Sequence, residues 1–378
     1  MLPYGRQTID QQDIDAVVET LRSPWLTTGP KVSQFEDAIA KFCGAEYAIA
    51  VSSGTAALHC AMASIGIGPG DEVIVPTMTF LATANCVVYQ GGTPVFADVD
   101  ADTLLLDTAS VEQRISARTR AIIAMDFAGQ ACDYDALRKI ADRHNLILVA
   151  DACHSLGASY KGRPVGTLAD ITVFSFHPVK AIACGEGGML VTNNKSLAEF
   201  SRRFRNHGMS RDSQQRELSN NWYYEMHAPG YNYRMSDIHA ALGLSQLSKL
   251  KHFIDRRREI AQIYNEVFST VFGIAPLSTV SEIGHAWHLY IISISDGELD
   301  RDELFAQLRK AQIGVNVHYF PVHLQPFYKE MYPAANCVVA EQVSRQIISL
   351  PIFPAMTNAD VQRVIETILG LVDSLRSQ

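Results

Sequence analysis

A lysine that follows a predicted strand is the first residue whose type and position suggest chemistry. Lys180 ends the stretch Ser175-Phe176-His177-Pro178-Val179-Lys180. Pro178 interrupts regular structure there, so the lysine is presented from a loop. A lysine amine can form a Schiff base with a carbonyl group. The alternative is an ordinary surface lysine, which is the commoner case when a lysine is considered alone.

A carboxylate ends another predicted strand. Asp151 follows the apolar run at 146–150. A carboxylate buried at that place needs a partner, and a protonated ring nitrogen would supply one. A helix cap or a turn explains the aspartate equally well. His154, three residues further on, would lie near such a ring, or else is a structural histidine.

A short run of small residues joins a predicted strand to a predicted helix. Gly54, Thr55 and Ala56 would allow a phosphate to reach backbone N–H groups at the helix N-terminus. Ser175, just before the lysine loop, is a second hydroxyl donor. A plain Ser/Thr N-cap is the competing interpretation. Gly185-Glu186-Gly187-Gly188 is interpreted as a turn into the next strand, because short glycine-rich matches are weak evidence for a phosphate loop.

These residue types together match the needs of one cofactor, pyridoxal 5'-phosphate (PLP). That cofactor requires a lysine for the Schiff base, a carboxylate for the pyridine nitrogen, donors for the phosphate and a flat group over the ring. Each signal is weak alone, so the elements that position the residues decide how much weight they carry.

Strand and helix patterns alternate from about residue 48 to residue 193. Short runs rich in valine and isoleucine predict strands at 48–51, 72–75, 95–97, 121–124, 146–150, 171–174 and 189–191. Helices are predicted at 11–22, 33–42, 55–65, 134–144, 236–250 and 253–268. This alternation indicates an α/β fold with a mainly parallel seven-stranded sheet covered by helices. Ligands of such sheets bind at the carboxyl ends of the strands, which is where the candidate residues stand.

The chain is long enough for two domains. We expect a large domain over residues 1–250 and a smaller α+β domain over residues 251–378. The smaller domain has a predicted strand at 288–294, helices at 301–311 and 358–375, and an irregular segment at 316–327. A polar, aromatic stretch without periodicity at 207–231 predicts a long functional loop.

Composition excludes several classes of partner. The net charge is -8, so no basic face attracts nucleic acid. No apolar run approaches the roughly 18 residues that span a bilayer, and residues 1–10 contain no signal-peptide core. The seven cysteines include no CxxC pair. We therefore expect free thiols in a reducing cytoplasm, no metal site and no membrane contact.

Five segments carry a resemblance to a known family. They are, in order, Ser53-Gly54-Thr55, residues 76–85 with Phe80, Asp151-Ala152-Cys153-His154, the lysine loop 175–180 and residues 230–237. This set closely resembles the DegT/DnrJ/EryC1/StrS family of fold-type I PLP enzymes, which act on sugar nucleotides. The resemblance covers nearly the whole chain and implies an aspartate aminotransferase-like fold.

The resemblance implies a role for each matched cofactor residue. Lys180 would hold PLP and carry protons, Asp151 would pair with the pyridine nitrogen, and Phe80 would cover the ring. Asn232 matches an asparagine that reaches the phosphate from a second subunit, which implies a homodimer with shared active sites. His154 is included among the cofactor-binding residues. The phosphate would be held by Gly54, Thr55, Ala56 and Ser175.

Two other stretches match substrate-contacting segments of the family. The first, within residues 1–30, contains Tyr4, Trp25, Leu26 and Thr27. The second contains His318, Tyr319, Phe320 and Pro321. The stretch before Asn232 is longer than the usual spacing in the family. The lid structure and the sugar specificity of the family therefore do not carry over to this chain from the resemblance.

Within the family the chain is most similar to the transaminases of pseudaminic acid biosynthesis. The resemblance rests on the Ser-Phe-His before the lysine and on residues 317–324. It implies transfer of an amino group from glutamate to C4 of a UDP-linked 4-keto-6-deoxy-N-acetylhexosamine, giving UDP-4-amino-4,6-dideoxy-N-acetyl-β-L-altrosamine. Enzymes for other nucleotide-linked keto-sugars, dTDP- or GDP-linked and aminated at C3 or C4, share most of these motifs.

Two classes of a different kind compete with an aminotransferase. PLP-dependent sugar dehydratases of the family have a histidine in place of the lysine, and Lys180 argues against that class. A non-catalytic regulator would keep the fold as a binding module. The presence of Lys180, Asp151 and the phosphate segment together argues against a pure binder.

Overall fold

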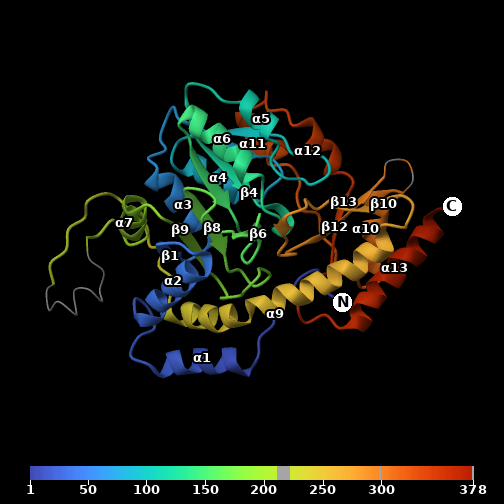
Figure 1. Ribbon diagram of the computed structural model, residues 1–378, viewed down its shortest axis with the longest axis horizontal. Helices are drawn as coiled ribbons and strands as arrows, with labels where there is room; N and C mark the ends of the chain where they lie inside the picture. The colour runs from blue at the N-terminus through green and yellow to red at the C-terminus, as the bar shows by residue number, and fades with distance from the viewer. Residues whose placement is uncertain (211–221, 296, 298, 377–378) are drawn as a thin grey trace.

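A seven-stranded sheet forms the centre of the computed structural model, which describes residues 1–210, 222–295, 297 and 299–376 (Figure 1). The strand order is β1-β9-β8-β5-β4-β2-β3. Strands β3, β2, β4, β5 and β8 pair in parallel, whereas β9 is antiparallel to both neighbours. The strands are β1 (Tyr47–Val51), β2 (Glu72–Pro76), β3 (Thr93–Ala97), β4 (Thr119–Met125), β5 (Ile147–Asp151), β8 (Ile171–Ser175) and β9 (Gly188–Thr192). All seven predicted strands are present, and the prediction of a mainly parallel sheet is confirmed.

Helices surround this sheet. They are α1 (Gln11–Arg22), α2 (Pro30–Cys43), α3 (Gly54–Ser64), α4 (Ala82–Tyr89), α5 (Thr108–Gln113), α6 (Tyr134–His144) and α7 (Lys195–Phe204). Helix α1 packs on the long helix at 237–268 and not on the strands (Figure 1). Helix α3 follows β1 directly and packs against β8 and β9, so its N-terminus lies at the ends of these strands. The sequence patterns predicted the bounds of α1 and α6 correctly, because amphipathic periodicity and caps coincide there.

A single helix, α9 (Asp237–Phe268), replaces the two helices predicted at 236–250 and 253–268. The prediction of a break was wrong. The residues between the two patterns are Lys251 and His252, neither of which interrupts a helix. The helix contacts α1, α2 and β10, and its buried residues Leu250, Phe253 and Arg257 continue at helical spacings across the expected break. Its 32 residues span about 48 Å, and Figure 1 shows it crossing the molecule.

A smaller antiparallel sheet, in the order β10-β12-β13, has its own hydrophobic core. Its strands are β10 (Ile274–Pro276), β12 (Tyr290–Ile294) and β13 (Ile347–Leu350), and it is flanked by α10 (Arg301–Lys310) and α13 (Asn358–Arg376). Leu2 belongs to this core, whereas Val322 and Ile347 belong to the core of the large sheet. The expected domain division at residue 250 falls inside α9 and stays a prediction.

Short elements complete the described chain. They are β6 (Ser159–Tyr160), β7 (Arg163–Pro164), β11 (Ile283–Gly284), the 3-10 helices η1 (Phe127–Gly129) and η2 (Val322–Leu324), α11 (Pro326–Met331) and α12 (Val338–Val343). The segment predicted to be irregular at 316–327 thus contains η2 and the start of α11. Of the predicted loop 207–231, residues 211–221 lie outside the described residues. Among the described residues, no helix has the length and apolar character needed to cross a membrane.

Candidate active site

A cavity of about 530 Å³ lies at the carboxyl ends of the sheet strands and contains most of the residues selected from the sequence. Its volume is typical of small-molecule sites, which run from ~300 to ~1,000 Å³. The predicted residues that line it are Tyr4, Gly54, Thr55, Phe80, Asp151, His154, Ser175, Lys180, His318 and Tyr319. Segments far apart in the chain therefore meet in one place.

Asp151 is the last residue of β5 and is only 3% exposed. Its neighbours across the sheet are Met125 on β4 and Val173 on β8, so strands flank it on both sides. The Thr83 hydroxyl donates to Oδ2 at 2.7 Å, and the Cys153 N–H donates to Oδ1 at 3.3 Å. Because a buried carboxylate needs a cationic partner, this residue fits the role of holding a protonated ring nitrogen.

Lys180 lines the same cavity from the loop after β8. Its backbone N–H donates to the His177 carbonyl at 2.8 Å, which forms the turn that carries the side chain inward. Burial lowers the pKa of Lys180, and the nearby Cys153 and Asp151 act in the opposite direction. A lowered pKa increases the fraction of neutral amine, which is the nucleophilic form needed for a Schiff base.

The N-terminus of α3 forms a cradle beside Ser175. Ser53 caps the helix by accepting from the Ala56 N–H at 3.1 Å. A Cβ on Gly54 would come within 2.9 Å of the Ser175 Cβ and 3.1 Å of the Cys153 sulfur, so only glycine fits without displacement. The first N–H groups of a helix have no acceptor within it, which suits a phosphate. Ala56 is buried and does not line the cavity, so its predicted phosphate contact stays a prediction.

Histidines and a tyrosine form another wall. His154 Nε2 lies 3.0 Å from the Tyr319 hydroxyl, and its ring centroid is 4.2 Å from that of His288. Burial lowers the pKa of His154 and of His288 well below the usual value. Burial also lowers the pKa of His318 to about 3, and His318 Nδ1 lies 2.8 Å from the Ser349 hydroxyl. All three rings are therefore neutral near pH 7.

Phe80 stands at the rim of the cavity with 55% of its surface exposed. It lies between β2 and α4, and its ring centroid is 6.3 Å from that of Tyr319. The Tyr319 N–H approaches the Met78 sulfur at 3.2 Å, so the segment of Tyr319 is in contact with the segment that carries Phe80. An exposed ring at the mouth of a cavity is available to cover a flat ligand.

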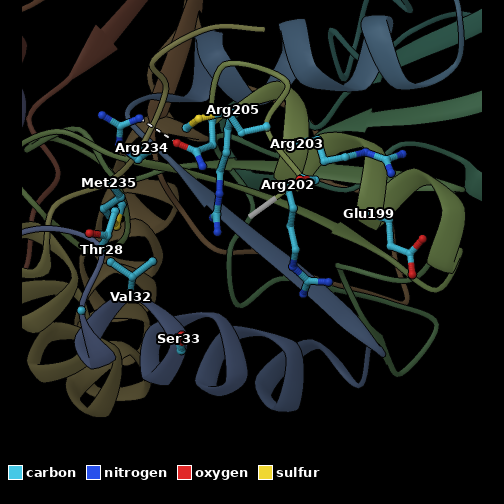
Figure 2. A pocket seen from close by; sticks show the side chains of 13 residues that line it. Thr28, Val32, Ser33, Glu199, Arg202, Arg203, Arg205, Arg234 and Met235 are labelled. Carbon is cyan, nitrogen blue, oxygen red and sulfur yellow. Dashed lines mark hydrogen bonds between the residues drawn. The ribbon is translucent and has the colours of Figure 1, made fainter. Parts of the chain in front are cut away.

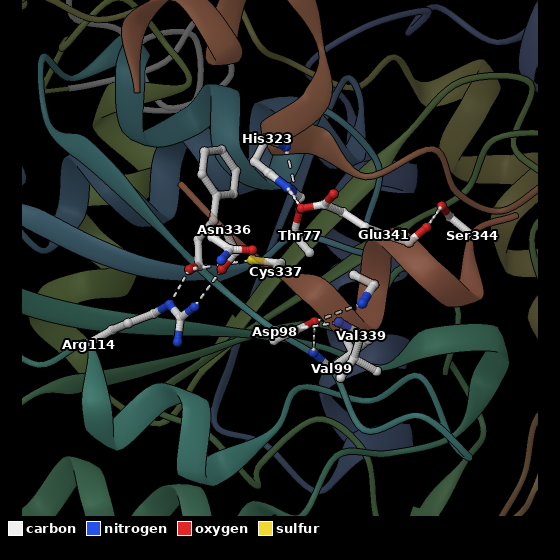
Figure 3. A network of polar contacts seen from close by, with 12 residues as sticks. Thr77, Asp98, Val99, Arg114, His323, Asn336, Cys337, Val339, Glu341 and Ser344 are labelled. Atoms are coloured by element: carbon white, nitrogen blue, oxygen red, sulfur yellow. Dashed lines mark hydrogen bonds and ion pairs between the residues drawn. The ribbon is translucent and has the colours of Figure 1, made fainter. Parts of the chain in front are cut away.

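A polar network fixes the segment around His323 to the end of β2, as Figure 3 shows. Thr77 Oγ1 lies 2.6 Å from His323 Nδ1, and His323 Nε2 lies 3.1 Å from Glu341. The Val322 N–H donates to the Thr77 carbonyl at 2.9 Å. Although a Thr-His-Glu series resembles a nucleophilic triad, the Thr77 side chain is fully buried, so the series serves to position the segment.

Several predicted residues lie outside the cavity. Neither Asn232 nor any of Trp25, Leu26, Thr27, Phe320 and Pro321 lines it. Asn232 is exposed and forms a bridge with Asn206, while Thr27 forms a bridge with Ser236. Phe320 is exposed near the second segment.

Asn232 and the stretch 25–27 stand near a second pocket, of about 300 Å³, which Figure 2 shows. We call it the arginine pocket, because Arg202, Arg203, Arg205 and Arg234 line it. Arg205 pairs with Glu36, and Arg234 donates to Asn206 at 2.8 Å. Asn206 thereby joins the arginine pocket to the backbone of Asn232.

Sequence reasoning missed two buried polar residues. His288 lies in a segment predicted only as a strand, where nothing marked it as a cavity residue. Asp126 directly follows β4, as Asp151 ends β5, so the same argument would have selected it. The Asp126 carboxylate accepts from Ser155 at 2.6 Å and from Tyr134 at 2.8 Å. Burial raises the pKa of Asp126 to about 6.

Comparison with known proteins agrees with this geometry. The sequence pattern of the DegT/DnrJ/EryC1/StrS aminotransferase family matches residues 7–369. The chain belongs to this family. A UDP-4-amino-4-deoxy-L-arabinose–oxoglutarate aminotransferase from Shewanella sediminis is 41% identical over 381 residues, which cover 98% of each chain.

Two solved structures of family members have nearly the same fold. Spr1654 from Streptococcus pneumoniae, assigned as a sugar aminotransferase and solved in its PMP form, aligns with a TM-score of 0.94 at 32% identity. PseC from Helicobacter pylori, an aminotransferase of pseudaminic acid biosynthesis, gives the same TM-score and identity. Both alignments cover 99% of this chain and at least 99% of the other.

PLP is the cofactor of this DegT-family aminotransferase, and the cavity fits it. The fit rests on a lysine and a buried carboxylate in one cavity, on a helix N-terminus where only glycine can stand, and on an exposed aromatic ring at the mouth. When bound, PLP supplies an electron sink that stabilises charge on carbon next to nitrogen. Lys180 would hold it, Asp151 would face its ring nitrogen, and Gly54, Thr55 and Ser175 would face its phosphate.

Proposed function

We propose that this enzyme transfers an amino group from glutamate to C4 of a UDP-linked 4-keto-6-deoxy-N-acetylhexosamine. The product would be UDP-4-amino-4,6-dideoxy-N-acetyl-β-L-altrosamine, an intermediate of pseudaminic acid biosynthesis. The observation that carries the proposal is the placement of Lys180, Asp151 and Tyr319 in one cavity. The structural likeness to PseC over 99% of both chains supports the choice of sugar.

The roles of the chain's own groups follow from their positions. The Lys180 amine would take a proton from the donor amino acid and return it to the sugar carbon. Asp151 would keep a negative charge beside the cofactor ring throughout. The neutral His154 would hold the Tyr319 hydroxyl at the cavity wall, and Phe80 would limit access of water from the mouth.

A second candidate is a UDP-linked 4-keto-pentose as the amino acceptor. It is favoured by the 41% identity to the Shewanella sediminis enzyme, whose name includes a UDP-linked 4-amino sugar and oxoglutarate. That relative also supports glutamate as the donor, because oxoglutarate is the keto acid that forms when glutamate gives its amino group to an acceptor. Both candidates require amination at C4 and differ in the substituents at C2 and C5.

We further propose a homodimer in which Asn232 completes the phosphate site of the partner subunit. Asn232 is exposed and lies outside the cavity of its own chain, which supports a role across an interface. The adjacent arginine pocket carries positive charge that suits phosphate groups. The enzyme would act in the cytoplasm, where its seven free cysteines remain reduced.

A substrate panel tests the proposed function. Purified enzyme would be incubated with glutamate and UDP-, dTDP- or GDP-linked keto-sugars, and the sugar product identified by NMR. We expect oxoglutarate and a C4 amine from the UDP-linked 4-keto-6-deoxy-N-acetylhexosamine, at a kcat/KM well above that of the 4-keto-pentose. A preference for the pentose would favour the second candidate, and loss of a hydroxyl without amination would indicate a dehydratase.

A further inference from the structure

Two buried threonine hydroxyls form a line that ends on Asp151. Thr79 Oγ1 lies 2.7 Å from Thr83 Oγ1, and Thr83 Oγ1 lies 2.7 Å from Asp151 Oδ2. Thr79 is 1% exposed and Thr83 is 0% exposed. Thr79 lies between β2 and α4, one residue before Phe80, and Thr83 lies in the first turn of α4. The segment that presents Phe80 at the cavity mouth thus also reaches the carboxylate at its base.

The direction of these hydrogen bonds follows from chemistry. An ionised carboxylate only accepts hydrogen bonds, so Thr83 donates its single proton to Asp151. The Thr83 oxygen is then left as an acceptor, and Thr79 donates to it. Hydrogen bonds in such a chain strengthen one another in a buried site. Neither hydroxyl carries a formal charge, so the negative charge of Asp151 stays available for a cation in the cavity.

We propose that Thr83, supported by Thr79, is a positioning residue that orients Asp151 toward the protonated ring nitrogen of PLP. The Thr83 bond fixes Oδ2 against rotation, while Oδ1 has only the longer Cys153 contact of 3.3 Å. A carboxylate held this way presents a fixed geometry to the ring and keeps its full negative charge, because its partner is an uncharged hydroxyl. The inference rests on the PLP chemistry of the proposed function and is independent of which sugar is aminated.

The test compares Thr83→Val, which keeps the shape and removes the hydroxyl, with Thr83→Ser, which restores it. Apo-protein would be titrated with PLP to give a dissociation constant. The visible absorbance of the bound cofactor would then be followed against pH. Thr172→Val is the matched control, because Thr172 is also buried, on the strand β8 beside β5, and its hydroxyl has no partner among the described residues.

We expect Thr83→Val to weaken PLP binding about tenfold, the low end for a hydrogen bond to a charged group. The pH midpoint of the cofactor absorbance should rise. A ring with less positive charge withdraws less electron density from the Schiff-base nitrogen that links it to Lys180, so that nitrogen keeps its proton to higher pH. The rate of the half-reaction with glutamate should fall without a change in the KM for the sugar. Thr79→Val should shift each quantity in the same direction by less, and Thr83→Ser and Thr172→Val should match the wild type.

A double-mutant cycle decides whether Thr83 acts through Asp151. In the Asp151→Asn background, Thr83→Val should have no further effect on the absorbance midpoint. Additive effects, or an unchanged midpoint in Thr83→Val with the fold intact by circular dichroism, would overturn the proposal. An enzyme that binds PLP normally but aminates no sugar would refute the proposed function alone, because PLP titration and absorbance do not depend on the sugar.

Discussion

The cofactor cavity and the arginine pocket differ in how completely one chain builds them. In the cavity, Asp151 is almost fully buried and hydrogen-bonded from two sides, and strands place Lys180 and Ser175 beside it. Near the arginine pocket, Asn232 is exposed, and Leu26 has about half of its surface exposed. The first region is preorganised, whereas the second presents polar and apolar groups to the outside.

This difference indicates a division of work between the two regions. A site that must hold a charged ring in one orientation is best formed by the ends of rigid strands. A site that selects a large nucleotide sugar can be assembled from loops and a second subunit. Changes inside the cavity should therefore affect the chemical step, and changes near the arginine pocket should affect retention of phosphate groups.

The largest expected effect comes from Lys180→Ala. Turnover should fall by about 10⁴-fold or more, since general acid–base catalysis alone contributes roughly 10²–10⁴-fold. The fold and part of the PLP affinity should persist, and borohydride should no longer fix the cofactor to the chain. Lys251→Ala, an exposed lysine on α9, is the control and should behave as wild type. Substantial transaminase activity in Lys180→Ala would refute its role.

Asp151→Asn should have the next largest effect. The change keeps size and removes the charge that faces the ring, so kcat should fall by about 10²–10³-fold, as for loss of one electrostatic stabiliser in an active site. The sugar KM should change little, because the substrate segments are untouched. Single-turnover kinetics with glutamate would measure the defect directly. A near-normal rate would mean that Asp151 only caps its strand.

Asn232→Ala tests whether the second region serves the partner subunit. Loss of one phosphate donor should weaken PLP binding about tenfold. Mixing Lys180→Ala with Asn232→Ala chains, carrying different tags, should give heterodimers with one intact site. We expect those heterodimers to recover activity that neither parent shows. Heterodimers as inactive as the parents would place Asn232 within its own subunit, and a fully active monomer would exclude the shared site.

The smallest effect concerns pH and the state of Lys180. Burial lowers the pKa of its amine below the ordinary value of 10.5, so the neutral, nucleophilic form is present at lower pH than in a free lysine. The rate at which apo-protein attaches PLP should therefore rise with pH and reach half its maximum below pH 10.5. Stopped-flow absorbance would measure this rate. A midpoint at or above that value would contradict the effect of burial.

The sequence predicted the sheet and the cavity well because each depends on local pattern. Valine- and isoleucine-rich runs marked the strands; Asp151 directly follows one such run, and Lys180 stands in the loop after another. The rigid sheet then brings their ends together. The single helix α9 was predicted as two helices, although Leu250, Phe253 and Arg257 keep helical spacing across the expected break.

Other features required three-dimensional contacts that no local pattern records. The arginine pocket combines α2, α7 and the segment around Arg234, which are separated by long stretches of chain. The line from Thr79 through Thr83 to Asp151 joins residues 68 positions apart at its last step. Threonines of this kind are common in strand-to-helix loops, so composition gave no reason to select them.

The central claim is that Lys180 moves an amino group from glutamate to the sugar, and isotope transfer tests it most directly. Enzyme would be incubated with ¹⁵N-glutamate and UDP-linked 4-keto-6-deoxy-N-acetylhexosamine, and the purified sugar nucleotide examined by ¹⁵N–¹H NMR. The account predicts ¹⁵N bound at C4 with wild-type enzyme and none with Lys180→Ala. Absence of ¹⁵N from every keto-sugar tested, or equal labelling by Lys180→Ala, would contradict it.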